Sequence, residues 1–443
     1  MGYAQYTDLD CSGVAWLQHI PCHWGVKRLK FSAELINNKV SVEESPLPYL
    51  GLEHIESWTG RKIEGEIVNS EGVASSFLAG DVLFGKLRPY LAKVHLAQRD
   101  GLISSEALVI RSKAELHAEF LKYYMLSRDF INIVNSSTFG SKMPRASWDF
   151  IGNLPVLLPE VEEQQAIASF LDFKTAQIDA LIAKKQALLE KLAEKRIALI
   201  SHAVTKGLNS SVPMKDSGAA WLGLIPESWK ILPFRRLIIG GTQNGIYKAK
   251  EFFSEDGTAF IQMGEAFSEP IIKRTAKDRV LLSQAELSQW GLEQGDLIFA
   301  RRSLVFEGSG KCAVVGELEE PHAYESSMIR VRLNKKEIMP MFAFHYFGGA
   351  FGRAQILATT KQVTISGIDS QQLKDVLVCV PPASEQDEIL DYIQQSECVY
   401  IRAHNKVTAV VERLQEYRSS LITNAVTGKI DVRSFIVPQF AKV

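Results

Sequence analysis

The stretch SGVAWLQHIPCHW, Ser12 to Trp24, occurs a second time as SGAAWLGLIPESW, Ser217 to Trp229, with eight of thirteen letters unchanged. A match of this length within one chain indicates that the sequence contains two copies of one unit. Two copies at a long period do not make a solenoid, which stacks short units several times. The sequence therefore predicts a tandem duplication, and the fold must be one that accommodates two equivalent halves.

Further matching pairs follow in the same order along the two copies. They are GDVLF (80–84) with GDLIF (295–299), SSEALVIR (104–111) with ESSMIRVR (325–332), LPEVEEQQAI (158–167) with VPPASEQDEI (380–389), and LISHAVT (199–205) with LITNAVT (421–427). The last two pairs share one offset of 222 residues. Between these matches the copies hardly resemble each other. We therefore expect a shared framework that carries divergent middle segments.

Composition narrows the class of protein. The 443 residues hold 50 Lys and Arg against 51 Asp and Glu, which argues against nucleic-acid binding by bulk charge alone. No apolar run approaches a membrane span, and the start MGYAQYTDLD lacks the features of a signal peptide, so we expect a soluble, cytoplasmic protein. The five cysteines form no CxxC pair, which favours reduced thiols and predicts no metal site.

The pattern of apolar, polar and turn-forming residues along the chain predicts an α+β fold with four regions. Short β-like runs alternate with turn signals and a helical patch in the first domain (1–158), and the plan repeats in the second domain (208–380). Each domain is followed by a long amphipathic segment, at 159–207 and at 381–443, the latter including a C-terminal tail. The first long helix is expected to end at Gly207, and Ser384 is a plausible N-cap of the second.

Apolar residues in both long segments recur at heptad spacing, which is typical of a coiled coil. The predicted seam comprises Leu171, Ile178, Leu181, Leu188, Leu192, Leu199, Ile393, Tyr400, Val407, Val410, Leu414 and Leu421. Each helix could instead lie on its own domain. About 45 residues span roughly 65 to 70 Å, more than the width of a small domain, which favours two helices packed antiparallel on each other in a pseudo-twofold arrangement.

A search for catalytic motifs gives one literal match. Phe306, Gly308 and Gly310 spell FxGxG, the glycine pattern of a nucleotide or S-adenosylmethionine loop. Such a loop should follow a strand and open a helix, whereas here CAVVGELEE predicts another strand. A glycine-rich hairpin turn is therefore the preferred interpretation. A self-sufficient methyltransferase stays as an alternative, and so does a coiled-coil scaffold that binds only proteins.

Polar, basic and aromatic residues gather at matched places in both copies. The first basic turn (residues 85–93) contains Lys86, Arg88, Tyr90 and Lys93, and the second basic turn (residues 300–311) contains Arg301 and Arg302. A second cluster precedes each long helix, with Lys142 and Arg145 in the first copy and Lys361, Gln362 and Thr364 in the second. Isolated basic turns are usually solvated surface. Recurrence in both copies favours contacts with DNA phosphates or base edges.

These motifs carry a resemblance to a known family. Two divergent domains that open with AWLxxIPxxW, long helices that open with LPEVEEQ and VPPASEQ, and the KLRPYLAK run at Lys86 resemble the specificity subunit of type I restriction-modification systems. The match covers nearly the whole chain. The second copy lacks the Leu-Arg-Pro-Tyr core, which makes the transfer of a DNA-binding role to Arg301 and Arg302 less direct.

The resemblance implies a function and a set of partners. In that family two target recognition domains each read one half of a bipartite, asymmetric site in double-stranded DNA, and the helices fix the spacer and bind two modification subunits. It implies that this chain is not itself an enzyme and holds no cofactor. S-adenosylmethionine is then expected in the modification subunits, and ATP and Mg in the restriction and translocase subunits.

Overall fold

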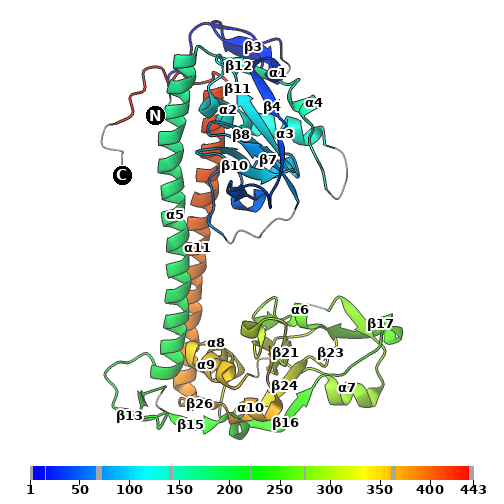
Figure 1. The fold of residues 1–443 in the computed structure, drawn as a ribbon. Helices are drawn as coiled ribbons and strands as arrows, with labels where there is room; N and C mark the ends of the chain where they lie inside the picture. Colours follow the sequence, from blue (N-terminus) through cyan, green and yellow to red (C-terminus); the bar gives the residue numbers. More distant parts are fainter. Residues whose placement is uncertain are drawn as a thin grey trace. The chain divides into compact units, whose positions relative to one another are not determined.

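The computed structural model describes residues 3–14, 16–65, 72–138, 143–219, 221–273, 276–360 and 366–438. It divides into two compact units. Unit 1 comprises Met1–Gln186 and Thr408–Val443, and unit 2 comprises Ala187–Val407. Two long helices, α5 (Val161–Lys206) and α11 (Ala383–Val426), each contribute one part to each unit (Figure 1). Among the described residues, no helix combines the length and the apolar composition that crossing a bilayer requires.

Unit 1 is built around a four-stranded antiparallel sheet in the order β4-β11-β8-β9. The inner strand β8 is buried at all four residues, which accounts for its uninterrupted apolar sequence. A second four-stranded sheet has the order β5-β7-β10-β6, and two ribbons pair β1 with β2 and β12 with β3. The strands of unit 1 are β1 (Leu9–Cys11), β2 (His19–Pro21), β3 (Gly25–Arg28), β4 (Ala33–Ile36), β5 (Lys39–Ser41), β6 (Tyr49–Leu50), β7 (Val73–Phe77), β8 (Val82–Gly85), β9 (Val94–Leu96), β10 (Gly101–Ser104), β11 (Ala107–Ser112) and β12 (Pro155–Leu158).

Short helices complete unit 1, and α2 and α3 lie beside the strands β8 and β11 (Figure 1). Aromatic side chains of α2 and α3, such as Phe120 and Phe130, are fully buried in a core that also contains Phe84 of β8. The helices are α1 (Leu29–Ser32), η1 (Leu52–His54), η2 (Pro89–Leu91), α2 (Ala118–Leu126), α3 (Arg128–Ser136) and α4 (Trp148–Ile151).

Unit 2 repeats this plan. Its main sheet has the order β16-β24-β20-β22-β18, in which the first four strands correspond to β4-β11-β8-β9, and a further sheet has the order β19-β17-β23. Three ribbons pair β13 with β14, β15 with β26 and β21 with β25. The strands are β13 (Met214–Asp216), β14 (Leu224–Pro226), β15 (Lys230–Pro233), β16 (Ile238–Asn244), β17 (Phe253–Ile261), β18 (Ile271–Ile272), β19 (Asp278–Val280), β20 (Leu297–Ala300), β21 (Arg302–Ser303), β22 (Cys312–Val315), β23 (His322–Tyr324), β24 (Met328–Leu333), β25 (Ser366–Gly367) and β26 (Leu377–Val380).

The helices of unit 2 also match those of unit 1. The pair α8 and α9 follows β24 in the chain, as α2 and α3 follow β11. The helices are η3 (Phe234–Leu237), η4 (Lys250–Phe252), α6 (Met263–Ala266), α7 (Gln284–Trp290), η5 (Phe306–Gly308), α8 (Pro340–Gly348), α9 (Ala350–Thr359) and α10 (Ser370–Asp375). The duplication read from the sequence is thus a duplication of topology.

A buried glutamine joins each domain to the start of its long helix. The Gln164 side chain accepts a hydrogen bond from the backbone N–H of His117 (2.7 Å) and donates to the carbonyls of Glu115 and Pro159 (both 2.9 Å). Gln386 lies 222 residues later and makes the same three bonds, at 2.8 to 3.0 Å, with Met339, Glu337 and Pro381. Because the glutamine side chains are themselves buried, with exposures of 0% and 1%, they supply these backbone groups with partners at a place that water scarcely reaches.

The two long helices pack on each other within each unit. In unit 1, Leu171 and Ile178 of α5 share one core with Leu421 and Ile422 of α11. In unit 2, the later part of α5 shares a core with the earlier part of α11, through residues that include Ile200, Val204, Ile389 and Ile393. The early half of one helix therefore meets the late half of the other, so the helices run antiparallel. The prediction of two α+β domains with a long antiparallel helix pair is confirmed.

One register of the predicted seam coincides with buried or partly buried positions. Exposure is 8% or less at Leu171, Ile178, Ile393 and Leu421. The remaining members of this register are partly buried, namely Leu192, Leu199, Tyr400, Val407 and Leu414.

The companion register lies one residue later than predicted in both helices. Leu181, Leu188 and Val410 are 40%, 39% and 38% exposed, whereas Ile182 and Leu189 are partly buried and Val411 is 9% exposed. Each exposed residue has an apolar residue directly after it, so hydrophobicity alone could not select the register. A straight helix favours contacts that alternate at three and four residues, and the structure takes the four-residue step from Ile178 to Ile182.

The ends of the long helices follow the local sequence. α5 begins at Val161 with Glu162 and Glu163 in its first turn, where negative charge suits the helix N-terminus. It is followed by Gly207 with φ +75°, as predicted, because a glycine tolerates this left-handed conformation. α11 begins at Ala383. Ser384 therefore lies within the first turn and is not the N-cap, since the carbonyl of Pro382 already accepts the N–H groups of Glu385 and Gln386.

Candidate nucleic-acid interface

The first basic turn links β8 to β9 and holds an unusual backbone conformation. Arg88 has φ +50° and Ala92 has φ +48°, so two residues with side chains adopt the left-handed region. Such residues are strained by roughly 1 to 3 kcal/mol each and concentrate at functional sites. The side chains of Arg88 and Tyr90 are exposed, Tyr90 by 45%. The turn thus presents a cation and an aromatic ring on a conformation fixed by Pro89.

The structure brings this turn together with the segment before α4. Leu87 and Arg145 form an antiparallel bridge, the N–H of Arg88 donates to the carbonyl of Pro144 (2.9 Å), and the N–H of Ala146 donates to the carbonyl of Lys86 (2.9 Å). The two clusters of the first copy are therefore one surface, which contains Lys86, Arg88, Tyr90 and Arg145. Lys142 lies outside the described residues.

Glu106 is a member of this surface that the sequence reasoning missed. Its carboxylate accepts two hydrogen bonds from Arg145, from Nε to Oε2 (2.8 Å) and from Nη2 to Oε1 (3.2 Å). The bond from Arg145 is the main reason that the pKa of Glu106 is lowered, and the nearby charges of Lys86 and Lys39 lower the pKa further. The carboxylate is thus ionised near neutral pH among three cations. In the sequence Glu106 stood only within the repeated segment SSEALVIR, and a single carboxylate gives no pattern of its own.

Lys93 lies differently from the other members of the first basic turn. Its Nζ donates a 2.6 Å hydrogen bond to the backbone carbonyl of Leu52, and the side chain is partly buried. This bond ties η1 to the turn. Lys93 therefore stabilises the position of the turn through this hydrogen bond, and its ammonium group does not project into solvent with Arg88 and Tyr90.

The second basic turn has the same backbone connections with different side chains. The N–H of Arg301 donates to the carbonyl of Ser327, and Arg302 pairs with Gly367 as Leu87 pairs with Arg145. Arg302 is exposed and Arg301 is partly buried. Ser303 follows and is buried, and the next two residues are apolar and exposed, Leu304 by 87% and Val305 by 61%. Lys361, Gln362 and Thr364 lie outside the described residues.

The FxGxG segment belongs to this second turn. Phe306–Gly308 form η5, and the chain then enters β22, which pairs antiparallel with β20. The carbonyls of Glu307 and Ser309 accept hydrogen bonds from Arg353, the latter at 2.5 Å. The segment is therefore a connection between two antiparallel strands, and a strand follows it where a nucleotide loop would open a helix. Among the described residues, no group of three or more His, Cys, Asp or Glu could hold a metal ion.

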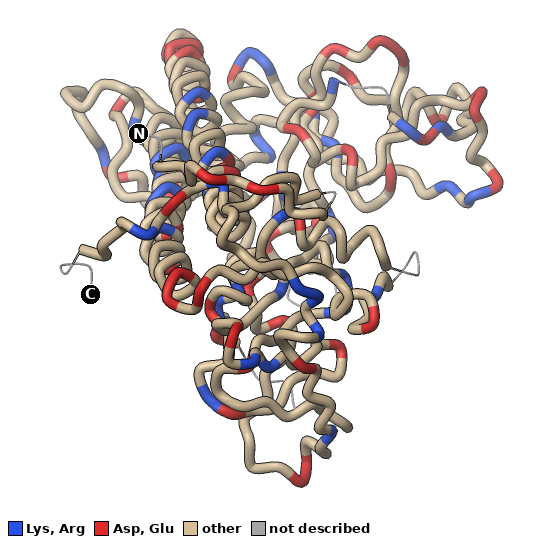
Figure 2. Tube along the Cα trace, turned by 90° about the horizontal axis from the view of Figure 1, so that it is seen from above, with Lys and Arg blue, Asp and Glu red and all other residues tan. Residues whose placement is uncertain are grey.

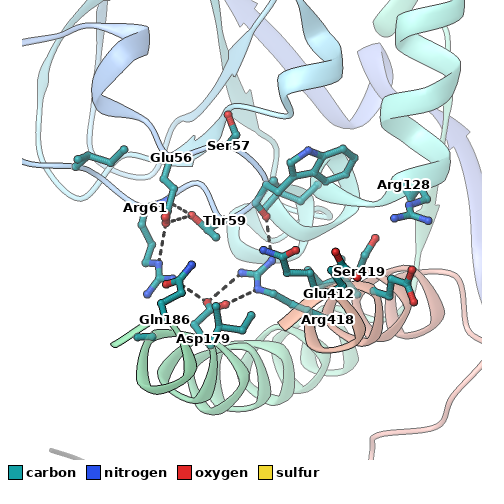
Figure 3. Close-up of a pocket in the computed structure, with 18 of the residues that line it drawn as sticks. Glu56, Ser57, Thr59, Arg61, Arg128, Asp179, Gln186, Glu412, Arg418 and Ser419 are labelled. Carbon is teal, nitrogen blue, oxygen red and sulfur yellow. Dashed lines mark hydrogen bonds and ion pairs between the residues drawn. The ribbon is translucent and has the colours of Figure 1, made fainter. Parts of the chain in front are cut away.

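A polar cavity of about 820 Å³ lies in unit 1 between the loop at 56–63 and the helices α5 and α11 (Figure 3). At its centre Asp179 accepts two hydrogen bonds from Arg418, from Nε (2.9 Å) and Nη2 (3.3 Å), and forms an ion pair with Arg61 (3.2 Å). Nη1 of Arg418 donates to the carbonyl of Trp58 (2.9 Å). These charges satisfy one another, so the geometry supports an anchor between the loop at 56–63 and the helices.

Charge is distributed locally in both units. Lys and Arg as well as Asp and Glu occur in both units (Figure 2). Single stretches nevertheless carry one sign: residues 82–99 hold Lys86, Arg88, Lys93 and Arg99 and no acidic residue, and residues 376–401 hold five acidic residues and no Lys or Arg. The cationic character of the candidate interface therefore depends on the few residues of the basic turns. This agrees with the near-zero net charge.

Comparison with known proteins identifies the family. The model of the type I restriction modification DNA specificity domain matches residues 54–191 and 243–413. The chain belongs to this family. It is 24% identical over 329 residues to the type I restriction enzyme EcoKI specificity subunit of Escherichia coli K12, covering 73% of this chain and 68% of that protein. It is 21% identical to the MjaVIII specificity subunit of Methanocaldococcus jannaschii, covering 94% and 95% of the two chains.

A shorter match has higher identity. The EcoDI specificity subunit of Escherichia coli is 31% identical over 173 residues, which are 37% of this chain and 38% of that protein. Among solved structures, a chain from a study of complex assembly and conformational transition of the type I R-M system has a TM-score of 0.71 at 17% identity and covers 92% of this chain and 98% of its own length. The HsdS subunit of Thermoanaerobacter tengcongensis has a TM-score of 0.51 at 17% identity and covers 93% and 98%.

The resemblance read from the sequence is confirmed. The chain is a specificity subunit of a type I restriction-modification system, the DNA-recognition member of the complex, and it carries two specificity domains. The residues proposed to contact DNA stay predictions. The geometry adds that Lys86, Arg88, Tyr90 and Arg145 lie on one surface, and that Arg301 and Arg302 lie at the corresponding place in unit 2.

Proposed function

We propose that each recognition domain reads one half of a bipartite, asymmetric site in double-stranded DNA. The observation that carries this proposal is the pair of basic turns, which share one set of backbone connections and differ in their exposed side chains. Arg88 and Tyr90 project from the first turn, and Arg302 and Leu304 from the second. Two domains that recognise different half-sites require the same backbone framework and different exposed side chains at the DNA-contacting turn.

We further propose that the antiparallel helices fix the distance between the half-sites and bind two modification subunits. In this proposal the modification subunits supply S-adenosylmethionine and methylate one adenine in each half, after turning it out of the duplex. Restriction and translocase subunits supply ATP and Mg. The chain itself then needs no cofactor, and it works in the cytoplasm where its DNA substrate is found.

The decisive experiment is to express the chain with its modification subunits and map methylated adenines across a genome by long-read sequencing. We expect a motif in two parts with a fixed unspecified spacer. In a complex with Arg88→Ala, the consensus of one half should relax while the other half stays intact. Equal relaxation of both halves would contradict the assignment of one half-site to each domain.

The two alternatives predict different results. A self-sufficient methyltransferase would bind S-adenosylmethionine in the absence of partners, and isothermal titration of the isolated chain would detect the heat. A protein-only scaffold would show no preferred DNA sequence in a gel shift with the modification subunits present. A preferred bipartite sequence excludes the scaffold.

A further inference from the structure

Arg145 and Glu106 form an ion pair on the surface that contains the first basic turn. The geometry of this pair determines which edge of the Arg145 guanidinium can bind a ligand. Arg145 uses Nε and Nη2 to hold both carboxylate oxygens of Glu106. This side-on arrangement engages one edge of the guanidinium. The outer edge, formed by Nη1 and the second hydrogen of Nη2, points away from the carboxylate by the planar geometry of the group.

The outer edge is available for a ligand. Within the part of the chain that the structure describes, Nη1 of Arg145 has no hydrogen-bond partner. The side chain is 51% exposed, beside the exposed Arg88 of the first basic turn. Arg145 is held at its backbone by the bridge to Leu87 and at its head by Glu106. A planar donor pair is thus fixed in orientation before any ligand arrives.

We propose that Arg145 reads a guanine and that Glu106 is the positioning residue that aligns it. This inference rests on the proposed recognition of DNA and names the base and the residue. Guanine presents O6 and N7 as two adjacent acceptors in the major groove, which match two parallel N–H donors of an arginine. Preorientation raises the specificity of such a contact, because less rotamer freedom is lost on binding.

The charge of Glu106 favours a base over a phosphate as the ligand. An ionised carboxylate, 28% exposed, would repel a phosphate placed against the same guanidinium. The edge of a guanine is neutral and meets no such repulsion. Lys86 and Lys39 lie near enough to Glu106 to lower its pKa, and they remain candidates for the flanking phosphates.

A second arginine in the chain provides a matched control. Arg279 also binds a carboxylate with two bonds, from Nη1 to Oε1 (2.9 Å) and from Nη2 to Oε2 (2.7 Å) of Glu320, and its Nε donates to the carbonyl of Gly257 (2.8 Å). Here the outer edge faces the carboxylate and Nε is also occupied. Arg279 is therefore structural, and Glu320→Gln removes a comparable ion pair without touching the proposed reader.

The test compares Glu106→Gln, Arg145→Lys and Glu320→Gln, each in the complex with modification subunits, by genome-wide mapping of methylation. We expect Glu106→Gln and Arg145→Lys to relax the same G·C pair in one half-site, with preference for that pair falling roughly 10- to 100-fold. Glu320→Gln should leave both half-sites unchanged. Unfolding curves of Glu106→Gln and Glu320→Gln should shift only slightly and to a similar extent, since the two carboxylates are 28% and 29% exposed and partly exposed ion pairs contribute little to stability.

Two outcomes would overturn the inference. If Arg145→Lys weakens binding to all sequences alike, or both variants of the pair keep the wild-type motif, Arg145 does not read a base. If Arg145→Ala also lowers the slope of log affinity against log salt by about one, the residue contacts a phosphate. In each case a bipartite wild-type motif would still stand, so failure of this inference is separable from failure of the proposed function.

Discussion

The two recognition domains agree where their residues are buried and differ where their residues meet solvent. Asp81 and Asp296, both nearly inaccessible, bind Arg111 and Arg332 respectively, and each also accepts a backbone N–H three residues before it. At the tips of the basic turns, Arg88–Pro89–Tyr90 of the first copy corresponds to Ser303–Leu304–Val305 of the second copy. Buried polar partners constrain the framework. At the tips Pro89 and Ser303 are also buried, whereas Arg88, Tyr90, Leu304 and Val305 are exposed, which leaves these side chains free to differ.

In the helix pair the contrast is reversed, because identical residues at equivalent positions lie in different surroundings. Arg196 and Arg418 are 222 residues apart and both occupy the seam. Arg418 and its partner Asp179 are 9% and 8% exposed, and Arg418 also holds the loop at Trp58. Arg196 and its partner Glu397 are 39% and 21% exposed, and Arg196 lies over the ring of Tyr400. Arginines at equivalent positions therefore form a buried ion pair in unit 1 and a partly exposed ion pair in unit 2.

The largest expected effect comes from breaking the anchor. Asp179→Ala leaves the Arg418 guanidinium buried without its carboxylate, which should lower the free energy of unfolding of unit 1 by about 4 kcal/mol. Glu397→Ala, the matched change in unit 2, removes a partly exposed pair and should cost about 1 kcal/mol or less. Urea unfolding of both variants measures the contrast. Equal costs would show that the two arginines are energetically equivalent after all.

The glutamines at the helix starts should behave alike, because their contacts are alike. Gln164→Ala and Gln386→Ala each leave one backbone N–H and two carbonyls without their partner, and each should cost roughly 3 kcal/mol. Hydrogen exchange at His117 and Met339 reports the two sites separately. Protection lost in one unit and kept in the other would refute the equivalence of the two frameworks.

Much of this organisation was predictable, for reasons visible in particular residues. The Leu, the Ile and the last Trp of AWLxxIPxxW are buried in both copies, and so is the Gln at the start of each long helix. Equivalent buried contacts require the same residue types, so the duplication and the long helices were readable. The second seam register was not, because Leu181 and Ile182, like Val410 and Val411, offer adjacent apolar choices that only packing decides. Glu106 and Asp179 were missed because single carboxylates carry no pattern, and their arginine partners lie 39 and 239 residues away.

A buried histidine makes unit 2 sensitive to acid, as His95 does in unit 1, where burial also lowers the histidine pKa. His345 occupies the position of Tyr123, 222 residues earlier, and burial lowers the pKa of His345 to about 4, with a smaller contribution from the charge of Arg196. The unfolded chain has a histidine pKa near 6.5, so it binds the proton that the folded state excludes. Stability of unit 2 is then full above pH 6.5 and falls by roughly 2 kcal/mol as the pH drops towards 4.5.

The variant His345→Gln should remove this pH dependence. Its free energy of unfolding should change less than that of the wild type between pH 6.5 and 4.5, and unit 1 should show no difference between the two proteins. Hydrogen exchange at the two pH values, resolved by unit, is the measurement. An unchanged pH profile in the variant would mean that other groups dominate the acid response.

The smallest effect on stability should occur at the tip of the second basic turn. Leu304 is 87% exposed, so Leu304→Ala should change the free energy of unfolding by less than about 0.5 kcal/mol. A large apolar side chain that contributes nothing to the fold has another use if the turn meets DNA, such as contact with a thymine methyl group. We therefore expect Leu304→Ala to alter the consensus of the second half-site alone, at constant stability. Altered preference in the half-site that Arg88→Ala affects would show that the two tips do not act on separate halves.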